Sequence, residues 1–258
     1  MYEDIKPSRS FEDLVNLVHI LRKECPWDRK QTPDSIKDNL IEEAYEAVEA
    51  ITSRDSDELK KELGDLLLHI IFQTRMADEK DEFEIGDVIY AIQEKLIRRH
   101  PHVFKDTEVE DEQEVAENWE SLKMKEGKQS VLDGIPIHLP ALIRAQRMQE
   151  KAANVGFDWP DTRQVLDKVY EELEELKKAV EHEDPDEAQK EFGDLLFSLV
   201  NIGRTYSFDA EDALRSTNNK FDERFRHVEK RLQETNRRPS DASLEEMDSY
   251  WDEAKSNY

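Results

Sequence analysis

Two groups of acidic residues in the second half of the chain have spacing typical of a metal-binding site. Glu171, Glu172 and Glu175 form the first group. Glu191 and Asp194 form the second, which begins sixteen residues after Glu175. Residues three apart lie on one face of a helix, so Glu172 pairs with Glu175 and Glu191 pairs with Asp194. Carboxylate oxygens, with no histidine or cysteine among them, are the ligands that suit Mg²⁺ or Mn²⁺.

The same pattern occurs earlier in the chain, where Glu42, Glu43 and Glu46 are followed sixteen residues later by Glu62 and Asp65. Acidic residues number 62 of 258, so a single copy is equally typical of a solvated helix surface. A second copy with identical spacing favours the metal interpretation. The candidate metal ligands are Glu172, Glu175, Glu191 and Asp194 in the second copy and Glu43, Glu46, Glu62 and Asp65 in the first.

Each set of ligands must be positioned by two antiparallel helices joined by a short turn. We predict the turns at residues 53–56 and 182–185, and in the second copy the nearest ligands are about seven residues from the turn. At a rise of about 1.5 Å per residue, these ligands lie about 10 Å from the turn and face each other at the same height. Carboxylates this close repel one another, which raises their pKa values, and a divalent cation removes that cost.

The whole chain is predicted to be all-α. Only 7 Gly and 9 Pro interrupt it, and Ser10 and Thr32 are expected to be N-cap residues. An acidic segment at residues 106–114 is expected to be a loop. Helices are predicted at about residues 11–25, 32–52, 57–78, 85–99, 142–152, 162–180, 186–206, 210–234 and 244–255.

Other motifs also recur, which indicates two tandem homologous domains. Lys-x3-Arg-x2-His-Val at residues 95–103 returns at 220–228, and Trp-x3-Lys at 119–123 returns at 251–255. A period of more than a hundred residues is that of a domain, not of a solenoid unit. We expect repeats at residues 10–126 and 141–258, joined by a linker at residues 127–140.

The net charge of −25 argues against nucleic acid as a partner, because phosphate backbones are repelled. Cys25 is the single cysteine, which fits a reducing compartment. The N-terminus lacks the pattern of a signal peptide, and the apolar clusters are too short to span a bilayer. We therefore expect a soluble, cytoplasmic protein with no membrane partner.

Basic and aromatic residues offer further candidates for binding. Lys220 and Arg224 are four residues apart and share a helix face, so they are able to bind phosphate, although an ordinary surface pair has the same spacing. Trp251 is able to stack on a base or sugar, but a tryptophan on a terminal helix is more often part of the core.

Taken together, the duplicated Glu-Glu-x-x-Glu and Glu-x-x-Asp motifs, with Cys25-Pro-Trp-Asp28 and Val155-Gly-Phe-Asp-Trp159, resemble the MazG family of nucleoside triphosphate pyrophosphohydrolases. The resemblance covers about residues 10–256. It implies four-helix-bundle cores completed by dimerisation, hence a homodimer. It also implies hydrolysis of an NTP, such as ATP, or a dNTP to the monophosphate and pyrophosphate, by water attack at the α-phosphate with Mg²⁺ and with Mn²⁺ as a substitute.

Roles for individual residues follow from their chemistry, and the resemblance adds the residues that contact the nucleotide. Glu171 or Glu172 would orient or deprotonate the attacking water, so these two are the candidate catalytic residues. Lys220 and Arg224 would stabilise the departing pyrophosphate. The residues implied to contact the nucleotide are Lys168, Val169, Tyr170, Glu171, Glu172, Lys190, Lys220, Phe221, Asp222, Glu223, Arg224 and Trp251.

The two halves differ in ways that favour the second as the main catalytic site. Lys168 stands three residues before the first Glu of its motif, whereas the first half has Asn39 there. The acidic segment at residues 106–114 would also repel a triphosphate, although the first half keeps all four candidate ligands. Glu187 stands where family members can have lysine, which places contacts near residues 187–190 in question. The alternative to an enzyme is a non-catalytic helical dimer that binds a nucleotide or a protein.

Overall fold

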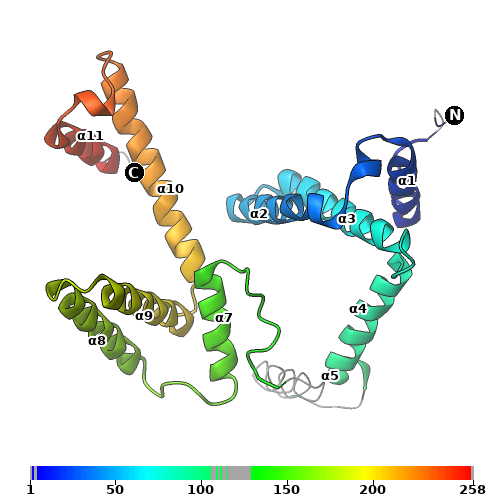
Figure 1. Ribbon diagram of the computed structural model, residues 1–258, viewed down its shortest axis with the longest axis horizontal. Helices are drawn as coiled ribbons and strands as arrows, with labels where there is room; N and C mark the ends of the chain where they lie inside the picture. Colours follow the sequence, from blue (N-terminus) through cyan, green and yellow to red (C-terminus); the bar gives the residue numbers. More distant parts are fainter. Residues whose placement is uncertain are drawn as a thin grey trace. The chain divides into compact units, whose positions relative to one another are not determined.

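The computed structural model describes residues 5–105 and 129–256, together with Tyr2, Val109, Asp111 and Val115. The chain divides into two compact units, residues 1–108 and 109–258 (Figure 1). Across the described residues the regular elements are α-helices and short 3₁₀ turns, without a β-strand. The predicted all-α fold is therefore confirmed. None of these helices is both long and apolar enough to cross a lipid bilayer.

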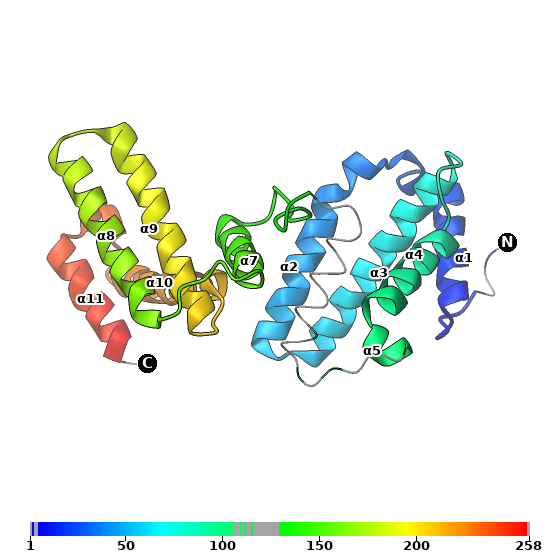
Figure 2. The ribbon, with the colours of Figure 1, turned by 90° about the horizontal axis from the view of Figure 1, so that it is seen from below.

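The first unit is built around an antiparallel hairpin of α2 and α3, which lie side by side (Figure 2). Its helices are α1 (Phe11–Glu24), α2 (Lys37–Ser53), α3 (Ser56–Asp78), α4 (Ile85–Arg99) and the short α5 (Pro101–Phe104), with 3₁₀ turns η1 (Asp28–Lys30) and η2 (Pro33–Ser35). Arg54, in the left-handed region at φ 59°, ends α2. Asp55 then caps α3 by accepting hydrogen bonds from the backbone of Asp57 and Glu58. This confirms the turn predicted at residues 53–56.

The second unit repeats this hairpin with α8 and α9. Its helices are α7 (Ala141–Ala153), α8 (Thr162–Glu181), α9 (Pro185–Thr205), α10 (Ala210–Gln233) and α11 (Leu244–Ser256), with η3 (Pro239–Asp241) before α11. Glu183, at φ 55°, turns the chain, and Asp184 caps α9 by accepting from the backbone of Glu187. Helix α7 packs against α9, and α10 packs against α11. The predicted turn at residues 182–185 is confirmed.

The predicted helices agree with the structure to within about one residue at each end, except at the start of α2. Thr32 is a cap, as predicted, but it caps η2: its side chain accepts from the backbone of Ser35, and Ser35 bonds back. Ile36 then departs from helical geometry, with φ −120° and ψ 7°, so α2 begins only at Lys37. The predicted acidic segment at residues 106–114 lies outside the described residues except for Val109 and Asp111. The predicted Trp119 and Lys123 lie outside them entirely.

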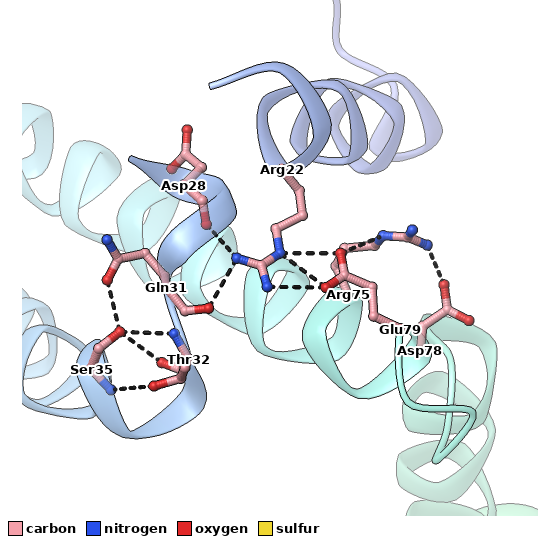
Figure 3. Close-up of polar contacts among 8 residues, drawn as sticks. All are labelled: Arg22, Asp28, Gln31, Thr32, Ser35, Arg75, Asp78 and Glu79. Carbon is pink, nitrogen blue, oxygen red and sulfur yellow. Dashed lines mark hydrogen bonds and ion pairs between the residues drawn. The ribbon is translucent and has the colours of Figure 1, made fainter. Parts of the chain in front are cut away.

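Arg22 joins the loop after α1 to the end of α3 in the first unit (Figure 3). Its guanidinium donates hydrogen bonds to the backbone oxygens of Asp28 and Gln31, the latter at 3.0 Å. It also forms two-pronged bonds of 3.0–3.1 Å to the Glu79 carboxylate and lies 5.7 Å from the centre of the Phe72 ring. The side chain is only 12% exposed. Arg22 thus satisfies loop carbonyls and a carboxylate beside the core cluster, which consists of Val18, Ile36, Ile71, Phe72 and Met76.

Replacing Arg22 with methionine should therefore destabilise the first unit. Methionine keeps most of the packing but removes the side-chain donor to the Gln31 backbone oxygen and the bidentate pair with Glu79, and we expect the free energy of unfolding to fall by about 1–3 kcal/mol. Urea unfolding followed by circular dichroism measures this. The exposed Arg29→Met variant is the matched control and should change stability by less than about 0.5 kcal/mol. Equal losses in the two variants would contradict the role of Arg22.

Candidate functional site

The α8–α9 hairpin brings the predicted acidic groups of the second unit together. Helix α8 carries Glu171, Glu172 and Glu175, and α9 carries Glu191 and Asp194. One carboxylate oxygen from each of Glu172, Glu191 and Asp194 lies within 4.8 Å of the others, and the same holds for Glu171, Glu172 and Glu175. Glu172 belongs to both groups. The hairpin therefore places ligands from its two helices close enough to share one cation.

Burial and mutual repulsion make this cluster electrostatically unfavourable without a counter-charge. Glu172 is only 5% exposed, Glu191 is half-buried, and Asp194 is exposed. Burial raises the pKa of Glu191, and the charges of Glu175, Glu187, Glu172 and Asp194 add to the effect. A bound divalent cation would remove this repulsion, which is the physical argument for a metal here.

Lys168 supplies a local positive charge one turn before the cluster. Its ammonium lies 2.5 Å from the Glu172 carboxylate and 2.9 Å from that of Glu171. Hydrogen bonds to Glu172 and then to Glu171 raise the pKa of Lys168, so it stays charged. This ammonium offsets part of the cost of burying Glu172, and its exposed fraction of 36% leaves it accessible to an incoming anion.

The first unit forms a similar cluster from α2 and α3 but lacks the lysine. Oxygens of Glu43, Glu62 and Asp65 lie within 4.8 Å of one another, and Glu62 is 6% exposed. Burial first, and then hydrogen bonding to Glu46, raises the pKa of Glu62 to about 7. Asn39 stands where the second unit has Lys168, so this cluster has no equivalent cation from that position.

Four predicted nucleotide contacts gather in a second place, on α10 and α11. The rings of Phe221 and Trp251 are 5.1 Å apart, and the Arg224 guanidinium lies 5.7 Å from the Trp251 ring, with Lys220 exposed one turn before Arg224. Figure 1 shows α10 leading away from the α8–α9 hairpin, with α11 packed on its far part. This basic and aromatic group is therefore carried by helices other than the α8–α9 hairpin, which carries the carboxylates.

The remaining predicted contacts are divided between the two helices of the hairpin and α10. Lys190 pairs with Glu187 at 2.7 Å, so its ammonium is directed to that carboxylate. Asp222 pairs with Arg226 at 2.6 Å on the exposed side of α10. The other three are Val169, which is half-buried, Tyr170, which is 65% exposed, and Glu223, which is exposed.

A cavity of about 200 Å³ adjoins Lys168 and was missed by the sequence analysis. Gln149 on α7 and Ser198 and Asn201 on α9 are buried polar residues in its wall. Glu43 and Glu172 are separated by the same 129 residues as Glu62 and Glu191, so the two halves can be compared position by position. In that comparison Asn201 corresponds to Phe72 of the first half. This replacement of an apolar residue by an amide was the sequence signal that could have indicated a polar cavity wall in the second half.

Comparison with known proteins identifies both halves as copies of one domain. A family model described as the MazG nucleotide pyrophosphohydrolase domain matches residues 31–104 and again residues 161–229. The two matches contain the two carboxylate clusters and the α2–α3 and α8–α9 hairpins. The repeat inferred from motif spacing is therefore confirmed.

Curated relatives resemble the chain over nearly its full length. The chain is 45% identical over 250 residues to the nucleoside triphosphate pyrophosphohydrolase/pyrophosphatase MazG of Thermotoga maritima, covering 95% of both chains. It is 44% identical over 237 residues to the nucleoside triphosphate pyrophosphohydrolase of Escherichia coli K12, covering 90% of both. It is also 47% identical over 236 residues to the uncharacterized protein YabN of Bacillus subtilis, covering 90% of this chain and 48% of YabN.

Without divalent cations, the stability of the first unit should fall as the pH rises. The pKa of Glu62 is raised from its ordinary 4.5 to about 7, so its contribution to stability is fully present below pH 4.5 and is lost as the pH passes through about 7. We expect the melting temperature in EDTA to fall between about pH 5.5 and 8. Mg²⁺ should raise it more near the upper end of that range, where Glu62 is ionised.

Thermal melts of Glu62→Gln across the same pH range test the assignment. This variant should flatten the pH dependence in EDTA and reduce the stabilisation by Mg²⁺. The exposed Glu49→Gln on α2 removes the same formal charge and should keep the wild-type profile. A Glu62→Gln profile identical to that of wild type would show that Glu62 is not the titrating group.

Proposed function

Because this chain belongs to the MazG family of nucleotide pyrophosphohydrolases, we propose that it hydrolyses a nucleoside or deoxynucleoside triphosphate to the monophosphate and pyrophosphate. The observation that carries the proposal is the α8–α9 hairpin, in which Glu172, Glu191 and Asp194 converge beside the Lys168 ammonium. A cluster of oxygen ligands next to a lysine suits a cation together with the phosphates that it accompanies.

The donor set fits Mg²⁺, because it consists of carboxylate oxygens. Glu172, Glu175, Glu191 and Asp194 would hold the ion. The pKa of Glu191 is raised first by burial and then by the neighbouring carboxylates, whose repulsion the ion would relieve. Mg²⁺ bound there would supply Lewis-acid polarisation of the phosphate oxygens and a lower pKa for a bound water. Mn²⁺, which accepts the same oxygen ligands, is proposed as a substitute.

Lys168 and Glu171 would bind the phosphate and activate the water, respectively. Lys168 would exchange its bond to Glu172 for a phosphate oxygen, and this would free the Glu172 carboxylate for ligation. Glu171 is exposed and lies next to the ligands, so it would orient the water or take its proton. Water oxygen then bonds to the α-phosphorus, the bond from that phosphorus to the bridging oxygen breaks, and pyrophosphate leaves with the electron pair.

Mutating ligands in each unit separately tests which unit catalyses. Glu172→Gln with Glu175→Gln should lower kcat by at least about a hundredfold, because two cation ligands are lost. The matched pair, Glu43→Gln with Glu46→Gln, should leave most of the activity, since the first unit lacks an equivalent of Lys168. The assay separates the nucleotide products from eight NTPs and dNTPs, with and without Mg²⁺.

The products and the variants distinguish the possible outcomes. Monophosphate plus pyrophosphate supports the proposed reaction, whereas diphosphate plus phosphate contradicts it. If the Glu172/Glu175 variant turned over at the wild-type rate, the site would lie elsewhere. If binding occurred without any product, the chain would be a non-catalytic nucleotide-binding protein.

We also propose a homodimer in which the second copy completes the site. The α8–α9 hairpin exposes apolar side chains that a stable fold normally covers, namely Tyr170, Leu173, Val180, Phe192, Leu196 and Leu199. Packing against the hairpin of a second copy would bury them as a four-helix bundle. Lys220, Arg224 and Trp251 stand on α10 and α11 and not on the hairpin, and we propose that they act on the carboxylates of the partner, where Lys220 and Arg224 would stabilise the departing pyrophosphate.

Mixing two inactive variants tests this shared site. One chain carries Glu172→Gln, and the other carries Lys220→Ala with Arg224→Ala. After exchange at equal amounts, half of the dimers are mixed and one of their two sites is intact, so about a quarter of the wild-type activity should return. Light scattering should give twice the mass of one chain. If the chains form mixed dimers but no activity returns, all the groups of one site belong to one chain.

A further inference from the structure

The cavity beside Lys168 has the walls of a site for a planar aromatic ring. It lies between α7, the Asp158–Trp159 segment, α8 and α9, and its volume is about 200 Å³. An engineered apolar cavity of about 150 Å³ is able to hold a benzene molecule. Trp159, Val165 and Phe197 give apolar surface, and Lys168 stands at the edge toward the carboxylates. A ligand ring in the cavity would thus have its charged part near Lys168.

Gln149 places an unused hydrogen-bond acceptor in this wall. The side chain is 9% exposed, and its amide nitrogen donates to the backbone oxygen of Phe197 at 2.8 Å. A carbonyl only accepts, so this bond fixes which end of the amide is nitrogen. The Gln149 Oε1 atom is buried and has no partner within the described part of the chain. Buried polar atoms are normally paired, and a ligand N–H group that reached this oxygen would supply the missing partner.

Asn201 offers the complementary donor. Its Oδ1 atom accepts from Arg204 Nε at 2.8 Å, and Arg204 is itself held by two bonds to Asp158 of 2.9 and 2.5 Å. Because a guanidinium only donates, Arg204 must face the amide oxygen and leaves the amide N–H groups of Asn201 for other partners. Asn201 is 4% exposed and lines the cavity. Arg204 and Asp158 are therefore positioning residues for this donor.

The first unit has an apolar core at the corresponding place. The positions 129 residues before Val165 and Asn201 are Ile36 and Phe72, and both are buried in the core cluster of that unit. Asn201 therefore lacks the apolar packing that Phe72 supplies at the corresponding position of the first unit. The polar wall is therefore particular to the unit that also has Lys168.

We propose that this cavity binds the nucleobase of the substrate, and that Gln149 and Asn201 recognise a base edge that presents one donor beside one acceptor. Gln149 Oε1 accepts from an amino or ring N–H group, and Asn201 donates to a ring nitrogen or carbonyl oxygen of the same edge. Such donor and acceptor pairs occur on every common base and are the pattern that amide side chains read. The inference rests on the proposed function, because it assigns the triphosphate to Lys168 and the adjoining carboxylates.

Nucleosides without phosphate test the cavity independently of catalysis. Adenosine, guanosine, cytidine and uridine are titrated into the full-length protein while tryptophan fluorescence is recorded. At least one should give a saturable change, because Trp159 lines the cavity, and Trp159→Phe should abolish the change. Asn201→Phe, which introduces the residue of the first unit, should weaken binding at least about tenfold by filling the space. No saturable signal from any nucleoside would overturn the proposal.

Kinetics then separate recognition from stability. Wild type is assayed on NTPs and on ribose 5-triphosphate, which has no base. Gln149→Leu should lower kcat/KM for the preferred NTP by roughly fivefold or more through loss of one buried hydrogen bond, mainly in KM. Its kcat/KM for ribose 5-triphosphate should stay within about twofold of wild type. Gln233→Leu, an exposed site on α10, is the matched control and should be unchanged on both substrates.

The outcomes distinguish failure of the inference from failure of the proposed function. If wild type hydrolyses NTPs but treats ribose 5-triphosphate equally well, the base is not read and the inference is wrong. Equal losses by Gln149→Leu on both substrates would show a structural role and would also overturn it. If no triphosphate is hydrolysed, the proposed function fails, and the nucleoside titration still decides whether the cavity binds a base.

Discussion

Buried carboxylates that face each other across a helical hairpin are the constraint on which the rest of the molecule depends. Glu172 is 5% exposed and Glu62 is 6% exposed, although each lies among other acidic side chains. A buried charge is costly unless it is paired, so each hairpin must neutralise its own cluster. The second unit does so with Lys168, and the first does so by raising the pKa of Glu62 to about 7. Both arrangements are compatible with a divalent cation as the counter-charge.

The helical framework was predictable because local signals mark its ends. Asp55 and Asp184 directly cap the second helix of each hairpin, and Arg54 and Glu183 take the left-handed conformation that turns the chain. Such signals act within about four residues and need no knowledge of the fold. The start of α2 was predicted wrongly for the same reason, since the reciprocal Thr32–Ser35 bonds satisfy one 3₁₀ turn completely and do not continue into a helix.

The candidate site was predictable only where a single helix or hairpin sets its geometry. The spacing of Glu172 and Glu175 fixes a helix face, and the short turn then fixes the opposite pair on α9. Gln149 is different, because it reaches the site through the packing of α7 on α9, forty-eight residues away from its partner Phe197. The contacts of Trp251 with Phe221 and Arg224 likewise depend on how α11 packs on α10, which periodicity does not encode.

The interiors of the two units differ in packing: the first is filled by apolar side chains, and the second contains a cavity with a polar wall. Phe72 packs with Ile36 in the first unit, and the Arg22 guanidinium lies over its ring, so that interior is filled. In the second unit Asn201 and Gln149 occupy the wall of a cavity, and one of their acceptors has no partner among the described residues. An unsatisfied buried amide lowers stability, and natural proteins retain such groups mainly where function uses them. The loss of packing and the presence of Lys168 occur in the same unit, and a substrate with an aromatic base and a charged tail would account for both.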